Sequence, residues 1–323
     1  MVREIPVIDY GPWFAGDDRA LGRLACELAH ACEEVGFYYA LNHGVPGELI
    51  ERAFNAARCF FAMPLDRKMA LQLNQDNVGY LPIGASVQAA STVHKAARPT
   101  QNQSFFVSHD RGFDHPDVIA GKPLRGRNQW PADLPELCAD MMAYFAALSA
   151  MCERMLPSFA AAIGMTADFF TPYFAGEPHT SLRFLRYPPQ NTIRNGVFGQ
   201  APHTDNCFIT VLAPSNAPGL AMRLPTGSWF EPPTIPGAFL INLGNILRRW
   251  SNDRFLSTPH RVINASGLDR YSIAFFFSPA PDSQIECLPS CASADNPARY
   301  QPAVYRDLIL EFYRPRSFCQ KDQ

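Results

Sequence analysis

The second half of the chain reads as a succession of short strands, and this pattern restricts the fold more than any other feature. From about residue 180 onward, β-branched and aromatic segments alternate with turns rich in Pro, Gly, Asn and Asp. The predicted strands span residues 180–187, 207–212, 219–224, 238–242, 260–264 and 270–278. Short, regularly spaced strands without helices between them indicate a sandwich or barrel, for which a double-sheet jelly roll is a common solution.

The first half is predicted to be mostly helical. Apolar residues recur at helical spacing over about 17–36, 46–63 and 134–163. Pro157 is expected to kink or end the last of these helices, because proline cannot donate a backbone hydrogen bond. Short strands are expected at 5–9, 37–41 and 103–108.

The chain is expected to form one unit. Its 323 residues contain no internal repeat and no linker that would separate two domains. Residues 1–170 would pack as a mostly helical part on a jelly-roll core formed by 171–282, with 283–323 as a C-terminal extension.

The composition excludes several classes of protein. The 28 Lys and Arg residues nearly balance the 30 Asp and Glu residues, and a net charge of -2 offers no electrostatic footprint for nucleic acid or a membrane surface. No apolar stretch approaches the ~20 residues that a membrane span needs, and we expect no secretory signal. Nine scattered cysteines without a CxxC pair are expected to be reduced, in a cytoplasmic protein with no obligate protein partner.

A candidate metal site consists of His203, Asp205 and, far along the chain, His260. On a strand, residues two apart point to the same face, so His203 and Asp205 could offer two ligands together. Two imidazoles and one carboxylate are the ligand set of mononuclear non-haem Fe(II) sites that leave coordination positions open. Zinc also accepts these ligands, but a structural zinc site needs a fourth protein ligand, and the sequence offers no candidate.

Most histidines in proteins are core or surface residues rather than ligands. We assign the remaining histidines to that class: His30, His43, His94, His109, His115 and His179.

Arg270 and Ser272 form a second informative pair, since they share one face of a predicted strand. A guanidinium fork beside a hydroxyl is a good receptor for a carboxylate. The alternative is a surface Arg–Asp pair with an unrelated strand serine. The apolar strand that follows favours a buried arginine, which needs an anion.

Several spaced motifs together resemble one known family. They are Ile5-Pro6-Val7-Ile8-Asp9, Gly36-Phe37, Asn42-His43-Gly44, Tyr187-Pro188-Pro189, His203-Thr204-Asp205, Pro218-Gly219-Leu220, Asn242-Leu243-Gly244, Trp250-Ser251-Asn252, Thr258-Pro259-His260-Arg261-Val262 and Arg270-Tyr271-Ser272. In this order they resemble the isopenicillin N synthase-like family of Fe(II)/2-oxoglutarate-dependent oxygenases. The resemblance implies a mainly β fold with flanking α-helices, built as a distorted jelly roll (double-stranded β-helix).

The resemblance also implies the roles of the site residues. His203, Asp205 and His260 would bind the iron, which the family uses with O2 and 2-oxoglutarate as co-substrates. Arg270 and Ser272 would hold the distal carboxylate of 2-oxoglutarate while its keto acid end chelates the iron.

Tyr187 matches a position that supplies a tyrosine to the co-substrate. Many relatives carry an asparagine two residues earlier, where this chain has Leu185.

The implied function is a dioxygenase that oxidises a small-molecule substrate and releases succinate and CO2. Hydroxylation is the expected outcome, with desaturation, ring closure and demethylation open. Two alternatives also remain open: an iron oxidase of the same family that needs no 2-oxoglutarate, and a small-molecule-binding barrel that has lost catalysis.

Four further residues are candidates for contact with the substrate. Strand parity places Arg183 inside the barrel with Tyr187, where it could bind an anionic group or form a salt bridge. Phe276 shares the face of Arg270 and could stack on a substrate or fill the core. The irregular segment 75–100, with Asn102 and Phe105 beyond it, is a candidate lid or substrate-side wall.

Overall fold

The computed structural model describes residues 5–86, 93, 98–190, 196–213, 215, 217–224 and 226–313. Its helices are α1 (Gly11–Phe14), α2 (Ala20–Glu34), α3 (Gly47–Ala62), α4 (Leu65–Met69), α5 (Pro116–Ile119), α6 (Pro135–Ala162), α7 (Thr171–Phe174), α8 (Asn245–Trp250) and α9 (Tyr305–Tyr313), with a 3-10 turn at Pro289–Cys291. Its first strands are β1 (Val7–Asp9), β2 (Phe37–Leu41), β3 (Gly79–Leu81), β4 (Gln103–Val107), β5 (Ser181–Tyr187), β6 (Gln200–His203) and β7 (Ile209–Ala213). The remaining strands are β8 (Leu220–Arg223), β9 (Trp229–Phe230), β10 (Phe239–Leu243), β11 (His260–Val262), β12 (Arg270–Phe277), β13 (Gln284–Ile285) and β14 (Ala303–Val304).

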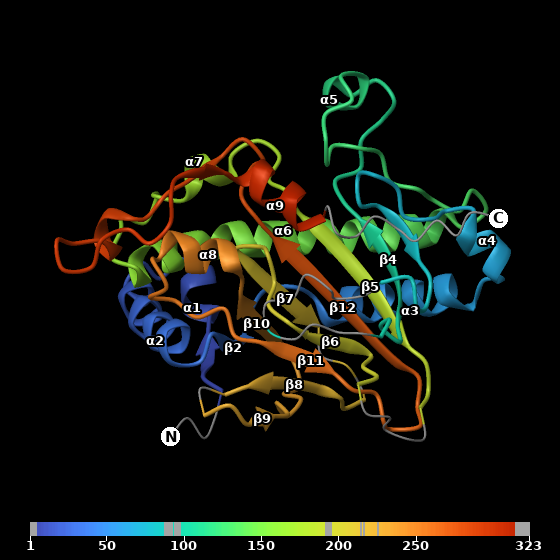
Figure 1. The fold of residues 1–323 in the computed structure, drawn as a ribbon, viewed down its shortest axis with the longest axis horizontal. Helices are drawn as coiled ribbons and strands as arrows, with labels where there is room; N and C mark the ends of the chain where they lie inside the picture. The colour runs from blue at the N-terminus through green and yellow to red at the C-terminus, as the bar shows by residue number, and fades with distance from the viewer. Residues whose placement is uncertain are drawn as a thin grey trace.

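Two sheets dominate the described part of the chain (Figure 1). The major sheet has the order β1-β2-β10-β7-β12-β5-β4-β3, and the minor sheet has the order β6-β11-β8-β9. The neighbours β4, β5, β12, β7 and β10 pair antiparallel, and except for β4 and β5 the paired strands are not consecutive in the chain. This mainly β architecture, with a large sheet, a smaller sheet and flanking helices, confirms the predicted jelly-roll class.

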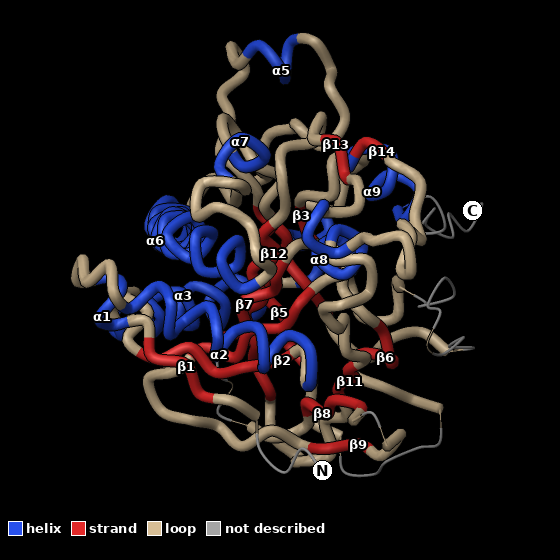
Figure 2. Tube along the Cα trace, turned by 90° about the vertical axis from the view of Figure 1, so that its left-hand side faces the viewer, coloured by secondary structure: helices blue, strands red, loops and turns tan. Residues whose placement is uncertain are grey.

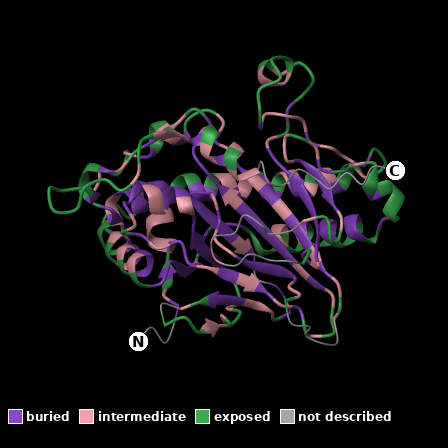
Figure 3. Cartoon of the chain, viewed as in Figure 1, coloured by how far each residue is buried: buried purple, intermediate pink, exposed green. Residues whose placement is uncertain are grey.

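The helices α2, α3 and α6 cover one face of the major sheet. α2 and α3 pack against α6, and both α3 and α6 contact β12 (Figure 2). Every residue of β4 and β10 is buried, because the other face of the sheet also points into the protein (Figure 3). The main hydrophobic core therefore lies between the helices and the sheet, and the opposite face of the sheet is left to form cavities.

The predicted strands of the second half are all present, but the region is not made of strands alone. α8 begins directly after Gly244, and α9 lies near the end of the described chain. The short strand β6, which contains Pro202, is not among the six predicted strands, although the metal-site argument assumed a strand at His203. Pro157 does not end its helix, since α6 continues to Ala162.

The predicted lid, residues 75–100, lies partly outside the described residues, because the structure does not describe 87–92 and 94–97. Its described beginning includes β3, which pairs antiparallel with β4. Among the helices that the structure describes, none combines the length and the apolar character needed to cross a membrane.

Candidate active site

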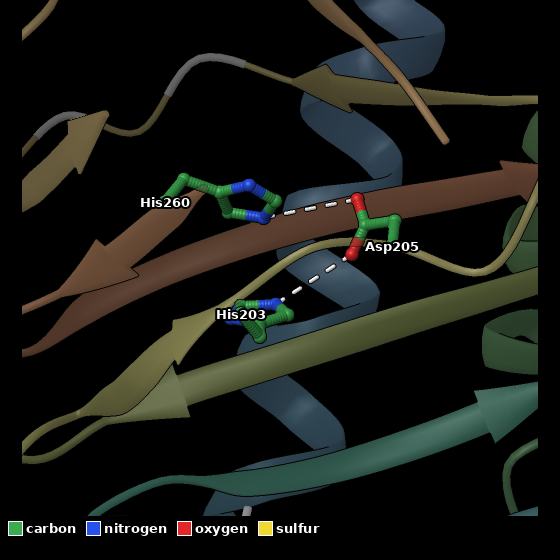
Figure 4. A group of neighbouring side chains, drawn as sticks. All are labelled: His203, Asp205 and His260. Carbon is green, nitrogen blue, oxygen red and sulfur yellow. Dashed lines mark ion pairs between the residues drawn. The ribbon is translucent and has the colours of Figure 1, made fainter. Parts of the chain in front are cut away.

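Three side chains converge at the junction of β6 and β11. His203 ends β6 and is the register partner of His260, the first residue of β11. The Nε2 atom of His203 lies 3.5 Å from Oδ1 of Asp205, and Nε2 of His260 lies 3.7 Å from Oδ2 of the same carboxylate (Figure 4). One nitrogen or oxygen of each residue lies within 4.8 Å of those of the other two, so all three could bind one ion.

The geometry corrects one step of the sequence prediction. Asp205 is not on a strand with His203, because β6 ends at His203 and Asp205 lies in the loop that follows. Its position is fixed instead by the backbone N–H of Asn245, which donates to the Asp205 carbonyl oxygen at 2.7 Å. The start of α8 therefore holds the loop that carries the carboxylate.

Both imidazoles present Nε2 to the site. Nδ1 of His203 lies 2.8 Å from the Ala201 carbonyl oxygen, and Nδ1 of His260 lies 3.2 Å from the Thr258 carbonyl oxygen. A carbonyl oxygen only accepts, so each Nδ1 carries the proton and each Nε2 keeps its lone pair for a metal. Burial and the neighbouring His260 lower the pKa of His203 to about 3, so this ring is neutral at physiological pH.

Asp205 is oriented by two donors. Thr210 Oγ1 and Asn242 Nδ2 both donate to its Oδ2 atom, at 2.6 and 2.8 Å. Burial alone would raise the pKa of this carboxyl, but the His260 and His203 rings and the two donors hold the pKa below its ordinary value. The group is therefore an anion, and it can accept a metal ion without first losing a proton.

One cavity, which we call the Arg270 cavity, extends from these three residues between the two sheets. It spans about 520 Å³, part of which is open to solvent, and is also lined by Arg270, Ser272 and Tyr187. Arg270 is 3% exposed, its Nε donates to the Ala217 carbonyl oxygen at 3.2 Å, and its guanidinium lies 4.9 Å from the centre of the Tyr187 ring. Burial lowers the pKa of Arg270.

One terminal nitrogen of that guanidinium has no partner. Within the described residues, Nη1 of Arg270 is buried and makes no hydrogen bond. A buried, charged donor without an acceptor is costly, and a carboxylate that enters the cavity would satisfy it. The residues present therefore fit a small organic acid whose other end reaches the three candidate metal ligands.

A second cavity, the α9 cavity, adjoins the first. It spans about 610 Å³, part of which is open to solvent, and its wall includes Tyr305, Ile309, Phe312 and Tyr313 of α9. The two cavities share four lining residues: Arg183, His203, Asp205 and Phe276. The candidate metal site thus lies between a cavity that contains a buried cation and a cavity with an aromatic wall.

The candidate substrate residues fall into different places. Arg183 and Phe276 line both cavities, as strand parity predicted. Asn102 lines neither of them, and its side chain instead bonds to Arg183, Gly199 and Gln200.

Phe105 is a correction, because it faces the helices. It is fully buried in the main core, and its ring stacks on Phe60 at 4.0 Å between centroids. The adjacent Phe106 points the other way into the α9 cavity, since successive strand residues alternate faces.

Sequence reasoning missed several residues of the site. Thr210 and Asn242 orient the carboxylate, and Gln200 lines the Arg270 cavity. Asn242 belongs to one of the motifs that carried the family resemblance, but the sequence analysis assigned no role to that motif. Gln200 carried no such signal.

Comparison with known proteins agrees with this geometry. Residues 5–133 match the model of the non-haem dioxygenase in morphine synthesis N-terminal region, and residues 177–279 match that of the 2OG-Fe(II) oxygenase superfamily. The chain is 34% identical to the 2-oxoglutarate-Fe(II) type oxidoreductase hxnY of Emericella nidulans, over 96% of this chain and 89% of that protein. It is also 34% identical to Kihadalactone A synthase LFS of Citrus sinensis, over 90% and 87%.

Solved structures show the same likeness. A full-length Neurospora crassa protein in complex with alpha-KG and thymine superposes with a TM-score of 0.84 at 26% identity, covering 96% of both chains. JOX2 in complex with 2OG, Fe and JA gives a TM-score of 0.77 at 28% identity, covering 95% of this chain and 84% of JOX2. The chain belongs to the isopenicillin N synthase-like family of 2-oxoglutarate- and Fe(II)-dependent oxygenases and is a dioxygenase that uses Fe(II), 2-oxoglutarate and O2.

Proposed function

We propose that this dioxygenase hydroxylates a small molecule bound in the α9 cavity. His203, Asp205 and His260 would bind the Fe(II), and Arg270, Ser272 and Tyr187 would hold 2-oxoglutarate in the Arg270 cavity. The observation that supports this most strongly is the buried Nη1 atom of Arg270, which lacks a partner among the described residues and lies in the cavity that the three candidate ligands share.

The chain's own residues would bind and orient the co-substrate. The Arg270 fork can donate charge-assisted hydrogen bonds to the distal carboxylate, and Ser272, two residues along the same face of β12, adds a hydroxyl. Thr210 and Asn242 keep the Asp205 carboxylate oriented. When bound, the iron supplies the activation of O2 that organic side chains cannot provide. The near-complete burial of Arg270 and Ser272 excludes water from the co-substrate.

Arg183 would bind an anionic group on the substrate, and Phe276 would stack on it. Nε of Arg183 donates to Ser104 Oγ at 3.0 Å, and its guanidinium lies 4.9 Å from the centre of the Phe106 ring. These contacts fix the cation at the boundary between the two cavities. An Arg183→Ala variant should bind substrate more weakly, while Arg186→Ala, on the opposite face of β5 that points toward the helices, should not. Unchanged substrate affinity in Arg183→Ala would remove this role.

The experiment that tests the function has two stages. Anaerobic binding of Fe(II) and 2-oxoglutarate is measured first, and a metabolite panel is then screened for O2-dependent release of succinate. O2 consumption is compared with and without 2-oxoglutarate, because a 2-oxoglutarate-independent oxidase would consume O2 in both. Absence of succinate across a broad panel would contradict the proposed reaction.

We also propose that residues 1–323 act as one unit in the cytosol, without nucleic acid or an obligate protein partner. The main hydrophobic core supports a single unit, since it joins side chains from both halves of the chain, such as Tyr38 and Phe275. The described cysteines are all free thiols, which suits a reducing compartment.

A further inference from the structure

We propose that Gln200 is an additional co-substrate-binding residue, whose amide donor is held toward the Arg270 cavity by a chain of hydrogen bonds that begins at Arg183. This inference rests on the proposed function, because it assumes that the cavity holds 2-oxoglutarate. The chain of bonds runs from Arg183 through Ser104 and Asn102 to Gln200 and connects the major sheet to β6 of the minor sheet.

The polarity of this chain is fixed at its first member. A guanidinium can only donate, so Ser104 Oγ accepts from Arg183 Nε at 3.0 Å, and Asn102 Oδ1 accepts from Arg183 Nη2 at 3.3 Å. The Ser104 hydroxyl then donates to the same Asn102 oxygen at 3.0 Å. The amide oxygen of Asn102 must therefore face Arg183.

The second amide follows from the first. With its oxygen toward Arg183, Asn102 turns its Nδ2 to the Gly199 carbonyl oxygen and to Gln200 Oε1, which lies 3.2 Å away. The oxygen of Gln200 is thereby used as an acceptor, and the other atom of its amide group is the donor Nε2. Among the described residues, this nitrogen donates to no protein atom, although Gln200 is only 4% exposed and lines the Arg270 cavity.

The position of Gln200 indicates which part of the co-substrate it meets. Gln200 is the first residue of β6, the strand that ends at the candidate ligand His203, and it faces Val262 of β11. Arg270 and Tyr187, paired in register on β12 and β5, serve the distal carboxylate from the major sheet. Of the two ends of the co-substrate, we assign the Gln200 donor to the keto acid end, because β6 also carries the candidate ligand His203.

The apolar Leu185 strengthens this assignment. Leu185, on β5, lines the same cavity and offers no hydrogen-bonding group. β5 therefore supplies no donor at this position, and Gln200 supplies one from the neighbouring sheet.

The test measures by calorimetry how tightly 2-oxoglutarate binds to the metal-loaded protein under anaerobic conditions. Gln200→Leu removes the donor at similar size and should weaken binding by about 10- to 100-fold, the usual range for a hydrogen bond to a charged acceptor. Gln200→Glu should bind still more weakly, because it places a negative charge beside the co-substrate. Gln301→Leu, at an exposed position, is the matched control and should bind like the wild type.

A truncated ligand identifies the end that Gln200 contacts. 2-Oxopentanoate keeps the keto acid but lacks the distal carboxylate, so Gln200→Leu should weaken its binding by the same factor as for 2-oxoglutarate. A loss confined to 2-oxoglutarate would overturn the assignment to the keto acid end. Affinity of Gln200→Leu within twofold of the wild type would overturn the whole inference, whereas a metal-loaded wild type that binds no 2-oxoglutarate would instead overturn the proposed function.

A second variant tests the polarity of the chain without touching the cavity. An aspartate at position 102 can only accept, so in Asn102→Asp the Gln200 amide should turn its Nε2 to residue 102 and its oxygen to the co-substrate. The affinity for 2-oxoglutarate should fall, and adding Gln200→Leu to Asn102→Asp should cost far less than it does in the wild type. If Gln200→Leu costs as much affinity in Asn102→Asp as in the wild type, so that the two losses add, the chain of hydrogen bonds does not orient the Gln200 amide. If Asn102→Asp does not fold, the Gln200 variants alone decide the inference.

Discussion

Replacement of Arg270 by methionine should abolish the stabilisation that 2-oxoglutarate confers on the metal-loaded protein. Methionine fills similar space in a cavity wall but provides no charge and no donor. The guanidinium is almost wholly buried, with Nη1 lacking a partner in the described part of the chain, so a bound carboxylate would gain two charge-assisted bonds there. At about 1.5–3 kcal/mol each, their loss corresponds to a Kd that rises more than 100-fold.

The magnitude of the thermal shift follows from the size of the chain. An unfolding entropy of about 2.1 cal/mol/K per residue gives 323 residues a shift of about 1.5 °C for each kcal/mol. At a 2-oxoglutarate concentration 100 times its Kd, ligand binding stabilises the folded state by about 2.7 kcal/mol, which raises the Tm of the wild type by about 4 °C. The same concentration should raise the Tm of Arg270→Met by less than about 1 °C.

The assay is a thermal melt with and without 2-oxoglutarate in the absence of O2. Only the ligand-induced shift is compared, because the substitution also changes the stability of the ligand-free protein. Arg186→Met is the matched control, since Arg186 pairs with Asp269 at 2.9 Å on the face of the same strand pair that points away from the Arg270 cavity. A shift of about 4 °C retained in Arg270→Met would refute the carboxylate-binding role of the guanidinium.

Three further predictions concern the surroundings of the site. Thr210→Val removes one of the donors that orient Asp205 and should weaken Fe(II) or Co(II) binding by about 10-fold or more in an anaerobic metal titration; unchanged metal affinity would contradict this. Burial lowers the pKa of His179 to about 3, so the folded state binds fewer protons than the unfolded state, and stability falls as the pH drops below about 6.5. In urea unfolding, His179→Gln should reduce the pH dependence of the free energy of unfolding by up to about 1.4 kcal/mol per pH unit between pH 6 and 4. An identical pH profile would show that the folded protein does not lower the pKa of this ring. In Gly244→Ala the added methyl group would meet the Cys207 carbonyl oxygen, so the variant should lose about 1–3 kcal/mol of stability and bind metal less tightly, and full metal affinity would show that the loop adapts.

The sequence was sufficient for the architecture and for the convergence of the three candidate metal ligands, because both depend on patterns that extend over many residues. Sequence-based prediction failed where a structural feature depends on only a few residues. α8 is six residues long, too short for helical periodicity to appear, so the sequence does not predict it. Phe105 was placed on the wrong face, because two adjacent phenylalanines leave the phase of an alternating strand undecided.

The hydrogen bonds that support the site could not be predicted from the sequence for a different reason. Asn102 and Gln200 lie far apart in the chain, and their contact depends on how β6 of the minor sheet lies against the residues that lead into β4 of the major sheet. No local pattern records such a contact. Likewise, the placement of Asp205 depends on a backbone bond from Asn245, which only the folded loop reveals.

The strand β12 presents Arg270 and Ser272 to one cavity and, six residues from Arg270, Phe276 to the boundary with the other. Six residues of strand extend about 20 Å, so these two ends are well separated. An engineer who wished to change the molecule that is oxidised could therefore redesign the face of α9 and leave the machinery that consumes the keto acid untouched.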